Sequence, residues 1–268
     1  TDHALDFLRA QSSNPPFYLS VHYFAPHAPW RRELHPPATF DSYMDGPLDS
    51  VPREPMHPWM HNWSEKSGRV YPEKTYPRDE TERRERLSGY YTAITEMDRN
   101  IGRIVAALDD LGLREDTLLA FTSDNGMNLG QHGIYGKGNG TFPQNMYDTS
   151  VKVPMIVNRP DHVPAGVVEE GLFSHCDLLP TLVEYAGAEP PKDDTLPGGS
   201  FAPLLRGETC PGADRVVVFD EYGPVRMVRT PDWKYVHRYP YGPNELYDLA
   251  NDPDEGYNLV AATGMAER

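Results

Sequence analysis

The sequence has 268 residues, with 25 Lys and Arg against 40 Asp and Glu, which gives a formal net charge of −15. Nucleic-acid binding needs a basic surface, so this balance disfavours a nucleic-acid partner. Because no apolar run reaches the roughly 18 residues of a membrane span, none is expected. Two cysteines, Cys176 and Cys210, are too few for a disulfide framework.

The first predicted elements are a short helix and a buried strand. Residues 1–11 read as an amphipathic helix, and residues 17–24 (FYLSVHYF) as a strand rich in aromatic and β-branched side chains. The strand ends at Pro26-His27-Ala28-Pro29, where the two prolines fix a non-helical turn. The residues alone favour a His27 side chain that pairs with the loop backbone.

Residues 33–80 are rich in proline and have no clear periodicity, which predicts a long irregular insertion. Its tryptophans argue against disorder, and we expect it to fold over the mouth of a site. A long helix follows over residues 78–112, because apolar side chains recur there at steps of three and four. We expect a break in that helix near Ser88-Gly89.

Residues 118–140 (LLAFTSDNGMNLGQHGIYGKGNG) carry the strongest functional signal. An apolar run turns abruptly into polar and glycine residues, as at the end of a buried strand, where α/β proteins bind ligands. Asp124 and Asn125 offer hard oxygen donors suited to Ca²⁺ or Mg²⁺, and Lys137 offers an ammonium suited to a tetrahedral oxyanion. A plain Asn-Gly turn is the alternative.

The remaining chain continues an α/β pattern. A buried strand is predicted over residues 151–157 and a helix over 177–186, followed by a Pro/Gly-rich linker over 190–212. Short strands over 216–222, 225–229, 233–239 and 245–249 predict a small antiparallel sheet. The predicted fold class is α/β, with a mostly parallel sheet flanked by helices and the small C-terminal antiparallel sheet.

Four blocks in chain order resemble the sulfatases, the formylglycine-dependent branch of the alkaline phosphatase superfamily. They are PFYLSVHYFAPHAPW at 16–30, SDNG with GQHGIYGKG between 123 and 138, SHCDLLPTLVEYAG at 174–187, and ELYDLANDPDEGYNL at 245–259. The blocks extend over nearly the whole chain. The resemblance implies the C-terminal portion of an alkaline-phosphatase-like large domain at 1–189, with 33–80 as an irregular insertion, then the linker at 190–212 and a small antiparallel subdomain at 213–268.

The resemblance also implies roles for individual residues. Asp124 and Asn125 would bind Ca²⁺, with Mg²⁺ as the alternative, and His27 and Lys137 would contact the sulfate and assist catalysis. His132 would either contact substrate or brace the loop. The expected substrate is a sulfated small molecule or glycan, and family habit favours a periplasmic, secreted or lysosomal location.

The family's nucleophile motif, Cys-x-Pro/Ala-x-Arg or its Ser variant, does not occur in the chain, and neither Cys176 nor Cys210 fits it. We therefore expect formylglycine to lie in an N-terminal portion that precedes this sequence, and the chain alone to be inactive. Phosphonate and phosphodiester hydrolases share the scaffold, but their metal loop more often reads Asp-His, so Asn125 favours a sulfatase. A non-catalytic truncated fragment is the remaining alternative.

Overall fold

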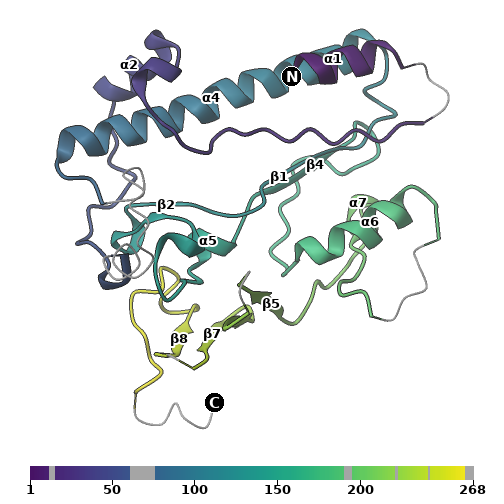
Figure 1. Ribbon diagram of the computed structural model, residues 1–268. Coiled ribbons are helices and arrows are strands. Elements are labelled where there is room, and N and C mark those ends of the chain that lie inside the picture. The colour runs from purple at the N-terminus through teal and green to yellow at the C-terminus, as the bar shows by residue number, and fades with distance from the viewer. Residues whose placement is uncertain (12–15, 61–75, 190–194, 221–222, 241, 263–268) are drawn as a thin grey trace. The chain divides into compact units, whose positions relative to one another are not determined.

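A computed structural model describes residues 1–11, 16–60, 76–189, 195–220, 223–240 and 242–262 (Figure 1). The chain forms two compact units. The first contains Thr1–Leu118 and Asn128–Gly136, and the second contains Leu119–Met127 and Lys137–Arg268. The chain therefore enters the second unit at residue 119, returns to the first unit at 128 and enters the second unit again at 137. The domain division predicted around 190–212 stays a prediction.

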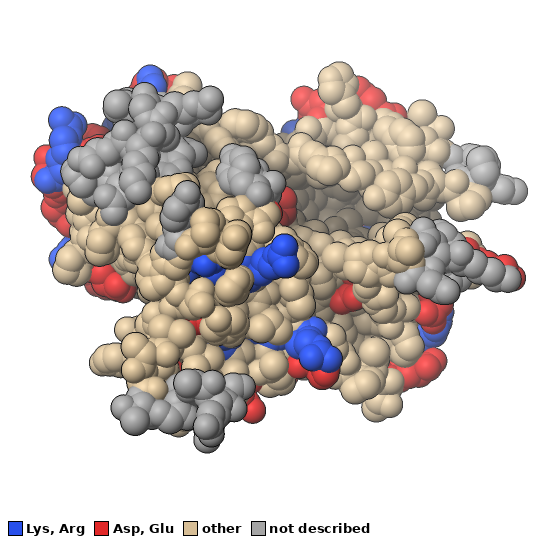
Figure 2. All heavy atoms as spheres, turned by 60° about the horizontal axis from the view of Figure 1, so that its bottom comes forward, with Lys and Arg blue, Asp and Glu red and all other residues tan. Residues whose placement is uncertain are grey.

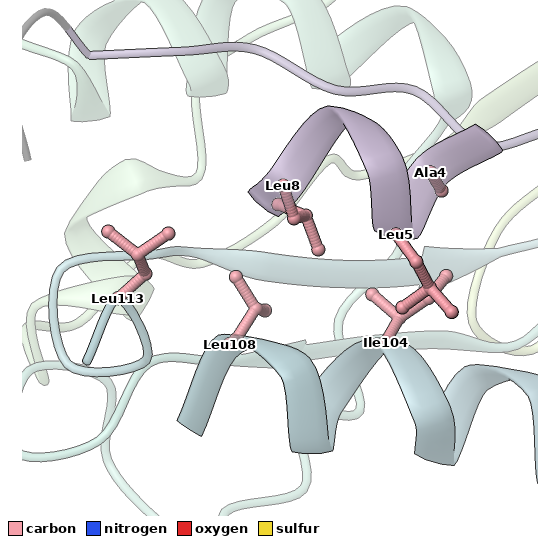
Figure 3. Packing of buried hydrophobic residues seen from close by; sticks show 6 residues of the cluster. All are labelled: Ala4, Leu5, Leu8, Ile104, Leu108 and Leu113. Carbon is pink, nitrogen blue, oxygen red and sulfur yellow. The ribbon is translucent and has the colours of Figure 1, made fainter. Parts of the chain in front are cut away.

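A long helix, α4 (Glu80–Asp110), organises the first unit. Asp79 caps it by accepting a 2.8 Å hydrogen bond from the Glu82 amide, and Gly112 takes a left-handed conformation just beyond its end. Helices α1 (Asp2–Arg9) and α2 (Pro37–Asp45) both pack on α4. Figure 3 shows side chains of α1 pointing toward those of α4; the buried cluster comprises Ala4, Leu5, Leu8, Ile104, Leu108 and Leu113.

The predicted break in the long helix is wrong, because α4 runs unbroken through Ser88 and Gly89. Gly89 instead allows a close approach of the chain. A Cβ atom added there would lie 2.2 Å from the Trp30 carbonyl oxygen, so no larger residue fits without a shift. The glycine therefore reflects helix-to-loop packing rather than helix termination.

The buried strand predicted over residues 17–24 is also wrong, since this segment forms no strand and pairs with none in the described part of the chain. Its alternation is nevertheless real. Phe17, Leu19 and Tyr23 pack against the α1–α4 cluster, whereas Tyr18 and Phe24 are 80% and 71% exposed. The segment is extended along the helices, and only a hydrogen-bonded neighbour would make it a strand.

The predicted insertion at 33–80 is not irregular throughout. A 3₁₀ turn at Arg32–Leu34 precedes α2, and Pro37 sits in the first turn of that helix, where its missing amide is no loss. Residues 61–75 of this insertion lie outside the described residues. The unit also contains a small antiparallel hairpin whose strands, β2 (Asn128–Leu129) and β3 (Tyr135–Gly136), have two residues each. A 3₁₀ turn at Gln131–Gly133 lies between them.

The second unit contains the strand that leads into the Asp124 loop. Strand β1 (Leu119–Thr122) pairs with β4 (Met155–Asn158) in an antiparallel register, with Leu119 opposite Asn158. The prediction of a mostly parallel sheet is therefore wrong for the described residues, in which every strand pair is antiparallel. An apolar run indicates a strand but does not give the direction of its partner. The strand predicted over residues 151–157 corresponds to β4. Its predicted burial is wrong too, because Ile156 is 60% exposed.

The C-terminal antiparallel sheet is confirmed. Its four strands lie in the order β5 (Val216–Phe219), β6 (Val225–Arg229), β7 (Trp233–Arg238) and β8 (Glu245–Asp248). Side chains of Val225, Met227 and Val236 on one face form a core with Met146. The helix predicted at 177–186 is confirmed as α6 (Leu178–Tyr185), and short helices α5 (Asp148–Val151) and α7 (Ala202–Leu205) complete the unit.

The surface agrees with the acidic composition. Figure 2 shows charged groups of both signs scattered among uncharged residues, with no broad basic patch on the face in view. Within the described residues, no helix has both the length and the apolar character to cross a bilayer. Cys176 and Cys210 are both free thiols, so they form no disulfide bond in this structure.

Candidate active site

The turn after β1 presents the Asp124 and Asn125 side chains. The Ser123 hydroxyl donates to the Asn125 carbonyl oxygen at 3.0 Å, and the Asn125 side-chain amide donates to the Gly126 carbonyl oxygen at 2.8 Å. Because the second bond holds the nitrogen of the Asn125 side-chain amide, its Oδ1 atom accepts from a partner outside the turn. The Asp124 side chain, one residue earlier in the chain, is exposed.

Gly126 anchors this turn to the rest of the second unit. Its amide donates to the Ser150 carbonyl oxygen at 2.9 Å. A Cβ atom at this position would lie 2.2 Å from the Thr149 carbonyl oxygen, so the close approach requires glycine. The chain bends at Asp124 and Asn125, and Gly126 has the conformational role that the Asn-Gly alternative implied.

Lys137 joins the turn from twelve residues further along the chain. Its Nζ atom donates a 3.1 Å hydrogen bond to Asn125 Oδ1, and both side chains are half-buried. Two of the residues predicted to form the site are thus in contact within one compact unit. An ammonium group in contact with an amide oxygen can bind an anion directly, or bind it together with a cation.

His27 lies in the first unit, at the end of the extended segment. Its Nδ1 atom is 2.7 Å from the Ala28 carbonyl oxygen, and its ring lies 4.8 Å from that of Phe24. A carbonyl oxygen only accepts hydrogen bonds, so Nδ1 carries the hydrogen and Nε2 holds the lone pair of the neutral ring. The backbone pairing favoured by the residues alone is therefore present, and the exposed ring still offers Nε2.

His132 also belongs to the first unit, between β2 and β3. Its backbone has φ 55°, a left-handed conformation that is uncommon outside glycine. Neighbouring Gly133 is equally constrained, since a Cβ atom there would lie 1.8 Å from the Pro55 carbonyl oxygen. These features show a tightly packed loop, which agrees with a bracing role for His132. The predicted convergence of His27 and His132 with Asn125 and Lys137 stays a prediction.

The turn after β1 offers part of the ligand set that a divalent cation needs. Asp124 and Asn125 have the hard oxygen atoms that Ca²⁺ prefers. In the part of the chain that the structure describes, however, no three His, Cys, Asp or Glu side chains are grouped to hold a metal ion. Ca²⁺ takes about six to eight oxygen ligands. The described residues therefore fit such a cation in kind and fall short in number.

Sequence reasoning missed two buried residues that support the loop. The side-chain amide of Asn145 donates to the carbonyl oxygens of Lys137 and Gly138, both at 3.2 Å. The Ser150 hydroxyl in turn donates to Asn145 Oδ1 at 2.6 Å. Asn and Ser are common in loops and belong to no motif here. Their burial, 0% and 3% exposed, could not be inferred from local polarity.

A second missed feature is an ion cluster under helix α5. Lys234, which is fully buried on β7, donates to Asp148, to Glu255 at 2.5 Å and to the Met146 carbonyl oxygen at 3.0 Å. Burial alone raises the pKa of Asp148, but Lys234 and Arg229 outweigh burial and lower that pKa. Among the cations of the cluster, Glu255 is paired with Lys234, whereas Asp148 is paired with both Lys234 and Arg229. Burial raises the pKa of Glu255. The cluster connects the C-terminal sheet to the helix that carries Ser150.

Comparisons with known proteins identify the family. The sulfatase family model matches residues 1–188, and the model for the C-terminal part of N-sulphoglucosamine sulphohydrolase matches residues 130–267. An N-acetylglucosamine-6-O-sulfatase of Bacteroides thetaiotaomicron is 26% identical over 335 residues, which cover 100% of this chain and 58% of that protein. The chain spans about half the length of the curated relatives it matches.

Solved structures agree at the level of the fold. A structure in complex with its substrate D-glucosamine-2-N,6-O-disulfate superposes with a TM-score of 0.76 at 20% identity, over 99% of this chain and 65% of that chain. A phosphonate monoester hydrolase of Agrobacterium radiobacter superposes with a TM-score of 0.70 at 25% identity, over 97% of this chain and 55% of that chain. The alkaline-phosphatase-like part of the predicted fold is thereby confirmed. The chain belongs to the sulfatase family of the alkaline phosphatase superfamily.

Proposed function

We propose that the protein is a sulfuric ester hydrolase, and that its substrate is a sulfated small molecule or glycan. The observation that carries the proposal is the contact between Lys137 Nζ and Asn125 Oδ1, at 3.1 Å, in a chain of the sulfatase family. The likeness to an N-acetylglucosamine-6-O-sulfatase and to a structure in complex with D-glucosamine-2-N,6-O-disulfate supports a sulfated saccharide.

The proposed reaction cleaves the S–O bond of a sulfate ester, with charge accumulating on the sulfuryl oxygens and on the leaving oxygen. Lys137 would bind one sulfuryl oxygen through its ammonium group, because a fixed positive charge in a preorganised site favours the charge of the transition state. His27 would also contact the sulfate, and His27 or Lys137 would assist the leaving oxygen. His27 would act as an imidazolium, because its Nδ1 hydrogen is already bonded to the Ala28 carbonyl oxygen and Nε2 has to carry the second proton. His132 would brace the loop or contact the substrate.

We further propose that Asp124 and Asn125 supply two ligands of a bound Ca²⁺ or Mg²⁺ ion. Such a cation would neutralise charge on the sulfuryl group and lower the pKa of the attacking hydroxyl. A formylglycine hydrate is the proposed source of that hydroxyl, and no residue of this chain is assigned to it. The exposed Asp124 carboxylate and the oriented Asn125 oxygen support this assignment.

The second candidate is a phosphonate monoester or phosphodiester hydrolase, which the likeness to the Agrobacterium radiobacter enzyme supports. Asn125 in place of histidine favours the sulfatase. The test is to express the protein from its full coding sequence and to measure kcat/KM for an aryl sulfate and an aryl phosphonate ester. We expect the sulfate ester to be preferred. A strong preference for the phosphonate would select the second candidate, and hydrolysis of neither would contradict both.

A further inference from the structure

Asn145 and Ser150 have no place in the proposed chemistry, yet they are among the most deeply buried polar residues of the second unit, at 0% and 3% exposed. Both lie beside the loop that carries Lys137. Burying a polar side chain has a cost unless its hydrogen bonds are satisfied, so each of their bonds is informative. All of the bonds described below lie within the second unit.

Asn145 fixes the backbone on which Lys137 sits. Its side-chain amide donates to the carbonyl oxygens of Lys137 and Gly138, both at 3.2 Å, and its backbone amide donates to Gly138 at 3.1 Å. A Cβ atom at Gly138 would lie 3.0 Å from the Asn145 carbonyl oxygen, so the two backbones lie close together. Asn145 thus restrains the point from which the lysine side chain extends.

Ser150 connects this restraint to the Asn125 turn. Its hydroxyl donates to Asn145 Oδ1 at 2.6 Å, and its carbonyl oxygen accepts from the Gly126 amide at 2.9 Å. With the contact of Lys137 and Asn125, the bonds form a closed circuit through residues 125, 126, 150, 145 and 137. Bonds in a buried circuit support one another, so loss of one loosens the rest.

We propose that Asn145 and Ser150 are positioning residues that keep Lys137 Nζ in contact with Asn125 Oδ1. Neither residue touches the substrate in this proposal, which rests on the proposed function only for its effect on activity. We call Asn145 and Ser150 with their hydrogen bonds the clamp. Helix α5, which carries Ser150, is bonded to the C-terminal sheet through Asp148 and Lys234, so the clamp is anchored to that sheet.

The test compares Ser150→Ala and Asn145→Ala with Thr181→Val in the full-length protein. Thr181 is a matched control in the same unit, because it is 1% exposed and its hydroxyl bonds Asp177 and Phe201 away from the loop. The first readout is amide hydrogen exchange at Gly126 and Gly140, which does not depend on activity. The second is kcat and KM for an aryl sulfate.

We expect exchange at both glycine amides to rise in Ser150→Ala and Asn145→Ala, and to stay unchanged in Thr181→Val. We expect kcat/KM to fall about 10-fold in Ser150→Ala, as for one lost hydrogen bond. In Asn145→Ala it should fall about 100-fold, as for a misplaced charged group, mostly through kcat. Thr181→Val should stay within about threefold of the parent protein.

Unchanged exchange at Gly126 and Gly140 in both clamp variants would overturn the proposal, whatever the activity. An equal loss of kcat/KM in Thr181→Val would also overturn it, because the effect would then be general destabilisation. If exchange rises while the parent protein hydrolyses no ester, the clamp is supported and the proposed function fails instead.

Discussion

Replacing Lys234 by methionine tests whether the buried ion cluster stabilises the second unit. Methionine keeps the long apolar part of the Lys234 side chain, which is 0% exposed, and removes its ammonium charge. It deletes hydrogen bonds to Asp148, Glu255 and the Met146 carbonyl oxygen. Removing one partner of a buried ion pair costs about 3–5 kcal/mol, because the remaining charge stays buried without compensation.

The contacts that remain place the expected loss at the lower end of that range. Asp148 keeps the Arg229 guanidinium at 3.2 Å, and Glu255 keeps the backbone amide of Asp148 at 2.6 Å. Burial already raises the pKa of Glu255, so the carboxyl can take up a proton when the ammonium is removed. We therefore expect a loss of about 3 kcal/mol in the free energy of unfolding. By the usual scaling for a unit of this size, the melting temperature falls by about 6–12 °C.

This loss is measured by urea unfolding, with hydrogen exchange in peptides that cover β6 and β7 as the probe of the transition. Arg206→Met is the control, because it breaks an ion pair of the same unit in which the side chains are 40% and 38% exposed. Exposed pairs contribute little, so no resolvable change is expected there. A Lys234→Met variant as stable as Arg206→Met would refute the reasoning about the cluster.

Three further predictions concern the acid limb, the long helix and the metal. Hydrogen bonds from arginines outweigh burial and lower the pKa of Glu82 to about 2, so its stabilising effect is lost as pH falls from about 4.5 toward 2. The melting temperature of Glu82→Gln should therefore fall less steeply with pH over that range than that of the parent protein, and parallel pH profiles would contradict this. Gly89→Ala should lose about 1–3 kcal/mol in chemical unfolding through its clash with Trp30, whereas Gly102→Ala, with open space around it, should gain about 0.5–1 kcal/mol; equal effects would argue against the contact. Calorimetric titration of the 268-residue chain with Ca²⁺ should give a Kd weaker than about 1 mM and no heat in Asp124→Asn, while a Kd below about 10 μM would mean that the ligand set is complete.

Local patterns predicted helices α1, α4 and α6 and the C-terminal sheet well, but not α2, α5 or α7. Periodic apolar spacing located α4, and two short runs of strand-forming residues located β6 and β7, because both signals lie within a few residues. The errors came from distant partners. Gly89 resembles a helix break until Trp30, 59 residues earlier, is seen against it. Residues 17–24 alternate like a strand, but their pairing depends on segments that the pattern does not identify.

The candidate site was predictable to a similar extent. Asp124, Asn125 and Lys137 were found from motif and chemistry, and the structure places Lys137 Nζ against Asn125 Oδ1. Asn145 and Ser150 were missed because a buried hydrogen-bond circuit leaves no periodic or compositional mark. Lys234 was missed for a related reason. A lysine in a strand reads as exposed, and its two carboxylate partners lie 86 and 21 residues away.

The most direct measurement of the central claim is aryl sulfate hydrolysis by the full-length protein and by its Lys137→Ala variant. Loss of a charge that stabilises the transition state costs about 100- to 1,000-fold in kcat, and that fall is the predicted result. An active parent protein with an unimpaired Lys137→Ala variant, or a parent protein that hydrolyses no sulfate ester, would contradict the account.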